Sequence, residues 1–441
     1  MRFLSFSALA VALALLPAFA QGADAVAPPK GFTAIFNGKD ITGWHGWAIH
    51  GKGGSPADIA KADEAARKKL IETWTEDSKK HWSVKDAELI NDGNGAYLAT
   101  EKEYGDYELF IDYKTVPKAD SGIYLKNGPQ VQIWDYTDKG KFSIGGDKGS
   151  GGLWNNSAGA AGKDPLVLAD KPLGEWNSFR IIQLGERTTI YLNGKLVVDN
   201  ARMENYWNRK GNLPAKGKIL LQTHGGEIRW RNIFLREIPA EEANAMLAKK
   251  HDTGFVSIFN GKDLTGWDGN VENYEVVEGA IMCKKGKGGN LFTKEEFADF
   301  IATAEYKLPP GGNNGFAIRY PGKGQPSTIG MTELQVLDDT AEKYAKLDPR
   351  QFNGSAYGMA AATKGYLRPL GEWNYQVMTV KGSTIKVELN GTLILDTDLS
   401  KITEFKGKEA HPGKDLKSGH FGFAGHGDAV AFRNLKIQVL K

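Results

Sequence analysis

One strand-like segment combines a carboxylate with an amide in a pattern suited to acid–base chemistry. In Thr332–Asp339 (TELQVLDD), Leu334 and Val336 alternate with Glu333 and Gln335. Successive side chains of a β-strand point to opposite faces, so we expect the two apolar residues to enter a core and the two polar residues to share the other face. A carboxylate held on such a face can accept or donate a proton during a reaction.

A similar segment precedes it in the chain, with amides where the later segment has an acid. Gln130, Gln132 and Trp134 alternate there with Val131 and Ile133. Two amides can bridge neighbouring hydroxyl groups, and an indole face can cover an apolar ring surface. We therefore expect a platform for sugars, and one that cannot take up a proton as a carboxylate does.

Each segment also has a cation and a histidine within reach in the sequence pattern. The preceding strand ends in Lys126 in the first set and in Arg319 in the second, and His224 and His426 close a later strand before a glycine turn. Arg319, Glu333 and His426 on one sheet face would form an acid–base site. Plainer interpretations stay open: a solvated surface Glu333, a surface ion pair of Arg319 with it, and a turn hydrogen bond from His426.

These parallels belong to an internal repeat. The sequence FTAIFNGKDITGW at 32–44 returns as FVSIFNGKDLTGW at 255–267, and LGEWN at 173–177 returns at 370–374. Ordered motifs that recur in pairs indicate a duplicated domain. Three further pairs support this: LNG at 192–194 and 389–391, THG at 223–225 and GHG at 425–427, and Arg-Asn at 231–232 and 433–434.

The repeat divides the chain into a first domain at 30–238, a linker at 239–252 and a second domain at 253–441. The linker contains EEANAMLAKK, whose acidic start and basic end predict a short helix. The first copy has roughly 26 extra residues, in which apolar residues recur at helical spacing and predict an amphipathic helix over 57–74. That helix could be a packing decoration, a lid over a site or a brace against the second copy.

Outside the helical insert and linker, period-two alternation and tight Asn-Gly turns predict many short antiparallel strands. The 54 glycines and 11 tryptophans fit this pattern. The fold class is therefore all-β, with two tandem sandwich or jelly-roll domains.

Composition narrows the partners and the compartment. The net charge of +3 and the absence of a basic stripe argue against nucleic acid, and the single cysteine, Cys283, excludes an internal disulfide. Arg2, the apolar run Leu9–Leu16 and the small residues Ala18 and Ala20 predict a signal peptide at 1–20, hence a periplasmic or secreted protein. No later segment is apolar enough to span a membrane.

Several chemistries lack their motifs. The sequence has no phosphate-binding loop, no His-Glu-x-x-His or paired-cysteine zinc site, no Gly-x-Ser-x-Gly elbow and no Glu-x-Asp-x-Glu strand of the kind found in β-sandwich glucanases. No cofactor is firmly implied. A divalent cation stays an option because Asp135, Asp138, Asp338 and Asp339 could supply oxygen ligands, although acidic loops are usually just solvated.

The repeated motifs together resemble the 3-keto-disaccharide hydrolase domain family, which has a concanavalin-like (lectin-like) sandwich fold and is common in exported bacterial proteins. The resemblance covers both copies. The second copy matches the family's Glu, Arg and His at Glu333, Arg319 and His426, and its Tyr-Gly at Tyr357. The first copy departs from the pattern at Gln130, Lys126 and Leu153-Trp154, and keeps only the histidine, His224.

The resemblance implies cleavage of a small-molecule carbohydrate, a 3-keto-glycoside. A ketone at C3 acidifies the C2 proton, so a base can start an elimination that expels the C1 substituent, and hydration completes the cleavage. Glu333 would be the base, Arg319 or a bound metal would stabilise the enolate, and His426 would be the acid. Gln335, Asp338 and Tyr357 would bind hydroxyls, and Lys126, Gln130, Gln132, Trp134 and His224 would bind substrate in the first copy.

Three other functions remain open at this stage. Both copies could be non-catalytic, lectin-like carbohydrate-binding modules, which the amide and indole face of the first copy favours. The chain could be a conventional glycoside hydrolase, although that chemistry uses two carboxylates flanking the bond. A structural or partner-binding role has no support beyond the repeat itself.

Overall fold

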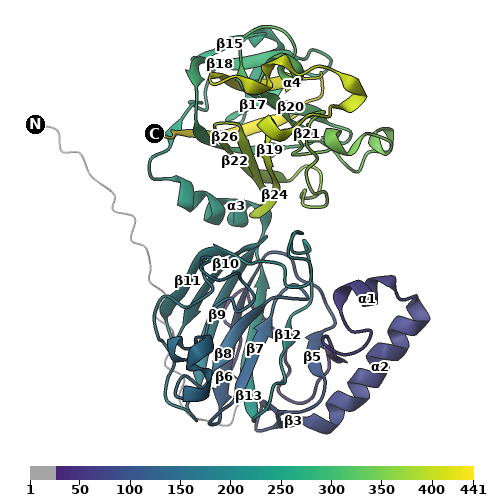
Figure 1. Ribbon diagram of the computed structural model, residues 1–441, viewed down its shortest axis with the longest axis vertical. Coiled ribbons are helices and arrows are strands. Elements are labelled where there is room, and N and C mark those ends of the chain that lie inside the picture. Colours follow the sequence, from purple (N-terminus) through teal and green to yellow (C-terminus); the bar gives the residue numbers. More distant parts are fainter. Residues whose placement is uncertain (1–25) are drawn as a thin grey trace, which may run out of the picture.

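The computed structural model describes residues 26–441, so the expected signal peptide at 1–20 lies outside the described residues. Figure 1 shows two β-sandwiches, one from each copy, stacked along the long axis of the molecule. Each sandwich consists of one larger antiparallel sheet and one five-stranded antiparallel sheet. The all-β prediction of two tandem sandwiches is confirmed.

The larger sheet of the first copy has the order β11-β10-β9-β6-β13-β4-β3, with β1 paired to β13. Its strands are β11 (Lys195–Arg202), β10 (Arg187–Leu192), β9 (Asn177–Leu184), β6 (Tyr107–Thr115), β13 (Ile228–Glu237), β4 (Glu88–Asn91), β3 (Trp82–Lys85) and β1 (Thr33–Ala34). The five-stranded sheet has the order β2-β5-β12-β7-β8. It contains β2 (Trp44–Trp47), β5 (Tyr97–Thr100), β12 (Leu220–Leu221), β7 (Asp120–Tyr124) and β8 (Gln130–Trp134).

The second copy repeats both strand orders, as β24-β23-β22-β19-β26-β17-β16 with β14 on β26, and as β15-β18-β25-β20-β21. The larger sheet contains β24 (Thr392–Asp398), β23 (Thr384–Leu389), β22 (Trp373–Lys381), β19 (Phe300–Lys307), β26 (Ala431–Val439), β17 (Ala280–Cys283), β16 (Tyr274–Val277) and β14 (Val256–Ser257). The smaller contains β15 (Trp267–Gly269), β18 (Gly289–Phe297), β25 (Gly419–Gly425), β20 (Asn313–Tyr320) and β21 (Thr332–Leu337). The sequence repeat is therefore a repeat of topology.

Side-chain alternation on the last strand of each five-stranded sheet follows the prediction. Val131 and Ile133 on β8 and Leu334 and Val336 on β21 are fully buried in the two hydrophobic cores. The polar residues between them therefore lie on the opposite face of the sheet, which we call the outer face.

The insert of the first copy forms two helices where one was predicted, α1 (Pro56–Lys61) and α2 (Glu64–His81). The break lies at Asp63, whose carboxylate accepts a hydrogen bond from the backbone N–H of Ala66 and so caps a new helix. Trp74 of α2 packs against Trp47 and Ile49 in a cluster formed by first-copy residues. The insert is thus a packing element on the outer face of β2 and β5, at the side of the sheet seen in Figure 1.

The remaining helices are short. The predicted linker helix is present as α3 (Ala240–Ala248), and α4 (Pro326–Ile329) precedes β21. No helix within residues 26–441 is long and apolar enough to cross a membrane.

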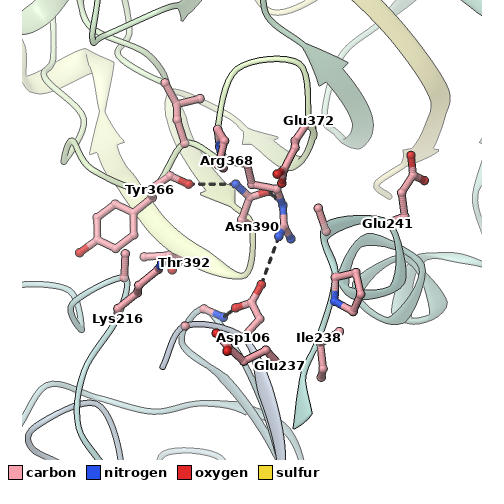
Figure 2. Close-up of a pocket in the computed structure, with 17 residues that line it drawn as sticks. Asp106, Lys216, Glu237, Ile238, Glu241, Tyr366, Arg368, Glu372, Asn390 and Thr392 are labelled. Atoms are coloured by element: carbon pink, nitrogen blue, oxygen red, sulfur yellow. Dashed lines mark hydrogen bonds and ion pairs between the residues drawn. The ribbon is translucent and has the colours of Figure 1, made fainter. Parts of the chain in front are cut away.

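Polar contacts join the two copies across the junction beside α3. Arg187 forms an ion pair with Glu388 of the other copy, and Arg368 reaches Asp106 at 3.3 Å. Figure 2 shows the cavity of about 510 Å³ at this junction, with Arg368 pointing at Asp106. These cross-copy contacts fix how the two sandwiches dock.

The repeated Arg-Asn motif is structural. In the second copy the Arg433 guanidinium and the Asn434 amide both donate to the Glu305 carboxylate, and the guanidinium lies 4.0 Å from the centre of the Trp373 ring. Arg231, Asn232, Asp112 and Trp176 repeat this arrangement in the first copy. These repeated contacts stabilise the larger sheet of each copy. The residues considered for chemistry lie on the smaller, five-stranded sheets.

Candidate functional site

The outer face of β21 presents a carboxylate that has no hydrogen-bond partner at one oxygen. Glu333 is only 4% exposed, and its Oε1 accepts no hydrogen bond from the residues that the structure describes. The nearest ionisable partner is the Nε2 of His426, at 3.8 Å from Oε1. The interpretation of Glu333 as a solvated surface acid is therefore wrong.

Strand order and one glycine bring Glu333 and His426 together. β21 pairs with β20, β20 pairs with β25, and His426 follows the last residue of β25. On β20 between them, Gly315 has no side chain, and a Cβ there would overlap the Glu333 carboxylate. The missing Cβ lets the acid lie across β20 towards the histidine.

Other polar side chains lie beside Glu333. Gln335 donates from Nε2 to Oδ1 of Asn313 at 2.9 Å, while its Oε1 has no partner within residues 26–441. The backbone N–H of Tyr357 donates to the Glu333 carbonyl at 2.9 Å, and its half-buried ring carries a hydroxyl that accepts from Gln351. Gln335 and Tyr357 thus lie beside Glu333, and their role in holding a substrate hydroxyl stays a prediction.

The charges of the pair are coupled. The neighbouring Glu333 carboxylate raises the pKa of His426, although burial acts in the opposite direction. A protonated imidazole beside a carboxylate can give a proton to one atom of a ligand while the carboxylate takes one from another.

The structure does not bring Arg319 to this pair. Its side chain is 1% exposed, and its guanidinium donates to the carbonyls of Ala298 (2.7 Å), Gly382 and Leu416 (both 2.8 Å) and to the Asp299 carboxylate (2.7 Å). A register shift in β20 and a left-handed φ of 45° take the residue out of the strand alternation. Arg319 therefore holds backbone segments together inside the fold, and the alternative of a surface ion pair with Glu333 is wrong.

Lys126 occupies the matching position in the first copy and behaves in the same way. It is 1% exposed, has a φ of 48° and donates to the carbonyl of Ala215 at 3.0 Å. Burial lowers the pKa of Lys126 to about 8. The expected substrate-binding role of Lys126 therefore does not fit its position.

The aspartates considered as metal ligands already accept hydrogen bonds from backbone N–H groups. Asp338 accepts from the backbone N–H of Gly311 and from Thr340, and Asp135 accepts from the N–H of Lys118 and from Thr137. Asp138 and Asp339 accept backbone N–H groups in the same manner. The described part of the chain contains no group of three or more His, Cys, Asp or Glu residues that could hold a metal ion. The hydroxyl-binding role expected of Asp338 does not fit these contacts or its burial.

In the first copy the predicted platform lies on the outer face of β8, but its residues are buried. Gln130 donates to the Gln132 side chain, which donates in turn to Oδ1 of Asp120 at 2.8 Å. The other oxygen of Asp120 lies 3.3 Å from Nδ1 of His224. Trp134 packs edge-on against Trp154 on the same face.

Sequence reasoning missed Asp120 and Asn313 on these faces. They are equivalent, because each opens the strand whose glycine, Gly122 or Gly315, lies beside the polar pair. Aligning DSGIYLK with NNGFAIR shows the difference. Among these positions each copy thus has one acid and two amides, but the acid stands on β7 in the first copy and on β21 in the second.

Comparison with known proteins agrees with the repeat. Residues 31–236 and 254–438 each match the family described as the 3-keto-alpha-glucoside-1,2-lyase-like domain. A 3-keto-disaccharide hydrolase of Bacteroides thetaiotaomicron is 27% identical over 250 residues, which cover 47% of this chain and 86% of that protein.

Two solved structures from Parabacteroides distasonis, both of candidate glycosyl hydrolases, are also similar. One is 25% identical with a TM-score of 0.37 and covers 46% of this chain and 99% of its own. The other is 27% identical with a TM-score of 0.38 and covers 42% of this chain and 99% of its own.

Proposed function

Because the chain belongs to the 3-keto-alpha-glucoside-1,2-lyase-like domain family, with two copies of that domain, we propose that its second copy cleaves 3-keto-glycosides by elimination and hydration. The family and the hydrolase relative support a carbohydrate hydrolase. The observation that carries the finer proposal is the unpartnered Glu333 oxygen beside His426.

The proposed reaction needs one base and one acid. Glu333 removes the C2 proton, and the C–H electron pair forms the enolate of the C3 ketone. Collapse of the enolate to a C1–C2 double bond expels the C1 oxygen, which takes a proton from His426. Water then adds at C1 and a proton returns to C2, which releases two free sugars. Gln335 and Tyr357 hold the ring hydroxyls.

This chemistry fits the face better than conventional glycoside hydrolysis does. Two-carboxylate glycosidases place a second acid about 5–9.5 Å from the first, on the other side of the bond. The closest ionisable neighbour of Glu333 is the imidazole of His426, and the equivalent of the first copy's Asp120 is the amide of Asn313. An acid–imidazole pair can serve an elimination in which the ketone itself activates the proton.

The direct test is cleavage of 3-keto-trehalose by the full chain and by Glu333→Gln. Removal of a general base typically lowers the rate ~10²–10⁴-fold, so we expect a loss in that range. Glu404→Gln changes an exposed acid of the same domain and serves as the matched control. In D₂O, the 3-keto-glucose product of the wild type should carry deuterium at C2. Wild-type turnover by Glu333→Gln, or a product with its original C2 proton, would contradict the proposal.

We also propose that residues 1–20 direct export to the periplasm or the medium, on the basis of their charge and apolar pattern. Mass spectrometry of the protein from the cell envelope or medium should then find a chain that begins at Gln21. A full-length cytosolic chain would argue against export.

A further inference from the structure

We propose that the first copy carries a second saccharide site, on the outer face of β7 and β8, which binds sugar and performs no proton abstraction. The proposal concerns a different domain from Glu333 and does not depend on turnover there. Its occupant is identified by chemistry as a neutral ring with several hydroxyl groups.

Two buried acceptors on this face have no donor. Gln130 is 4% exposed and Gln222 is 5% exposed, and Oε1 of each lacks a hydrogen-bond partner within the described residues. Both flank Gly122, where a Cβ would lie 3.2 Å from the Gln130 amide carbon and 3.1 Å from Oε1 of Gln222. Buried amide oxygens are normally satisfied, so this pair indicates that donors arrive from outside the chain. Sugar hydroxyls supply such donors.

An aromatic cluster adjoins the amides. His50 lies against the rings of Tyr97, Tyr124 and Trp207, with ring centres 5.9, 5.9 and 5.3 Å away. The Tyr97 hydroxyl accepts a hydrogen bond from Gln222 at 3.1 Å, and Tyr124 stands opposite Gln130 in the β7–β8 pairing. His50, Tyr97 and Trp207 are at least partly exposed, whereas Tyr124 is buried. Exposed aromatic rings of this kind can pack against the C–H faces of a pyranose while their polar atoms bind its hydroxyls.

The insert of the first copy packs against this aromatic cluster. Trp74 of α2 and Trp47 of β2 belong to the hydrophobic group that also contains Tyr124, and Tyr97 and Trp207 pack against that group. The second copy has no such insert, and Ala317 stands where the first copy has Tyr124. Only the first copy therefore has this aromatic cluster within the described residues.

The acid of this face is held in a way that suits binding rather than catalysis. Asp120 contacts Gln132 at 2.8 Å, Lys141 at 3.0 Å and His224 at 3.3 Å, so both of its oxygens are engaged. Burial raises the pKa of Asp120, but the hydrogen bonds from His224 and Lys141 outweigh it and the net pKa is lowered. A base needs a free lone pair, which Glu333 has at Oε1 and Asp120 lacks.

Tryptophan fluorescence tests the site separately from the second copy. The second copy has only Trp267 and Trp373, which lie in its core and beneath Arg433 on its larger sheet, whereas Trp207 lies in the proposed site. Titration of the full chain with trehalose should give a saturable change in emission. Trp207→Phe should remove most of that change.

Amide variants test the contacts themselves. Gln130→Ala and Gln222→Ala should each weaken trehalose binding about tenfold in calorimetry, whereas Gln325→Ala, in an exposed loop of the second copy, should bind as the wild type does. Unchanged affinity in both amide variants would overturn the proposal, as would the absence of any emission change with either trehalose or 3-keto-trehalose.

The non-catalytic part has its own test. In D₂O, Glu333→Gln should exchange the C2 proton of 3-keto-trehalose no faster than buffer does, although the sugar still changes the emission of Trp207. Exchange above the buffer rate would show that the first copy performs chemistry. Failure of the Glu333 assignment would appear as wild-type cleavage by Glu333→Gln alone and would leave the fluorescence result unaffected.

Discussion

Replacement of Arg319 with lysine distinguishes a structural role from a catalytic role for this buried cation. The chain itself offers this substitution, because the first copy has Lys126 at the equivalent position. An enolate stabiliser would touch substrate, whereas the structure shows a guanidinium spread over the carbonyls of Ala298, Gly382 and Leu416 and the Asp299 carboxylate.

The expected magnitude follows from the number of hydrogen bonds. Arg319 makes three to backbone carbonyls, whereas Lys126 makes one, to the carbonyl of Ala215. Arg319→Lys should therefore lose about two charge-assisted hydrogen bonds, which contribute ~1.5 kcal/mol each at the lower end of their range. The free energy of unfolding should fall by about 3 kcal/mol. For a domain of this size that corresponds to a Tm about 6–12 °C lower.

Calorimetric melting of the full chain, together with turnover of 3-keto-trehalose well below the Tm, separates the two roles. We expect a large drop in the Tm of the second domain and a kcat within about threefold of the wild type. An unchanged Tm with a hundredfold lower kcat would refute the structural assignment of Arg319.

Three further predictions follow from single contacts. A Cβ on Gly46 would overlap the Trp74 carbonyl, so Gly46→Ala should displace α2 and lower the Tm of the first domain, whereas Gly105→Ala, with its nearest contact at 3.5 Å, should melt as the wild type does. Because Glu333 raises the pKa of His426, turnover should fall only as the pH rises above the usual range of a histidine, and His426→Asn should abolish that dependence in a pH–rate profile. Lys126 has a folded pKa of about 8 against 10.5 unfolded, so the unfolded chain binds more protons between these values and stability should rise with pH across that window. In urea unfolding, the stability of Lys126→Met should rise less steeply with pH across this window than the stability of the wild type. An equally steep rise would show that Lys126 does not cause the pH dependence.

The sequence alone was sufficient for the architecture because the signals that set it are local. Alternation in Gln130–Trp134 and Thr332–Leu337 assigned the core and outer faces correctly, since strand side chains alternate whatever lies around them. The repeated motifs predicted a duplicated sandwich, and the duplicated strand orders confirm it. The helical pattern of the insert predicted one helix where the structure has two, because Asp63 caps the start of a second helix within it.

The sequence did not determine where the charged side chains point. Arg319 and Lys126 stand next to the polar strands in the chain, but a left-handed φ at each directs their side chains into the fold. Asp338 looked like a ligand for hydroxyls and instead accepts hydrogen bonds from the backbone N–H groups of Gly311 and Thr340. Backbone conformation at single residues decides such directions, and residue type does not encode it.

The tertiary structure also decided which acid faces which histidine. The sequence alone determined that both copies share a sandwich scaffold and that Glu333 lies on the outer face. It could not show that β20 and β25 bring His426 to 3.8 Å from that acid, or that Asp120 on β7 meets His224 in the first copy. Sheet order joins residues about a hundred positions apart, so a site made across neighbouring strands exists only once the sheet has formed.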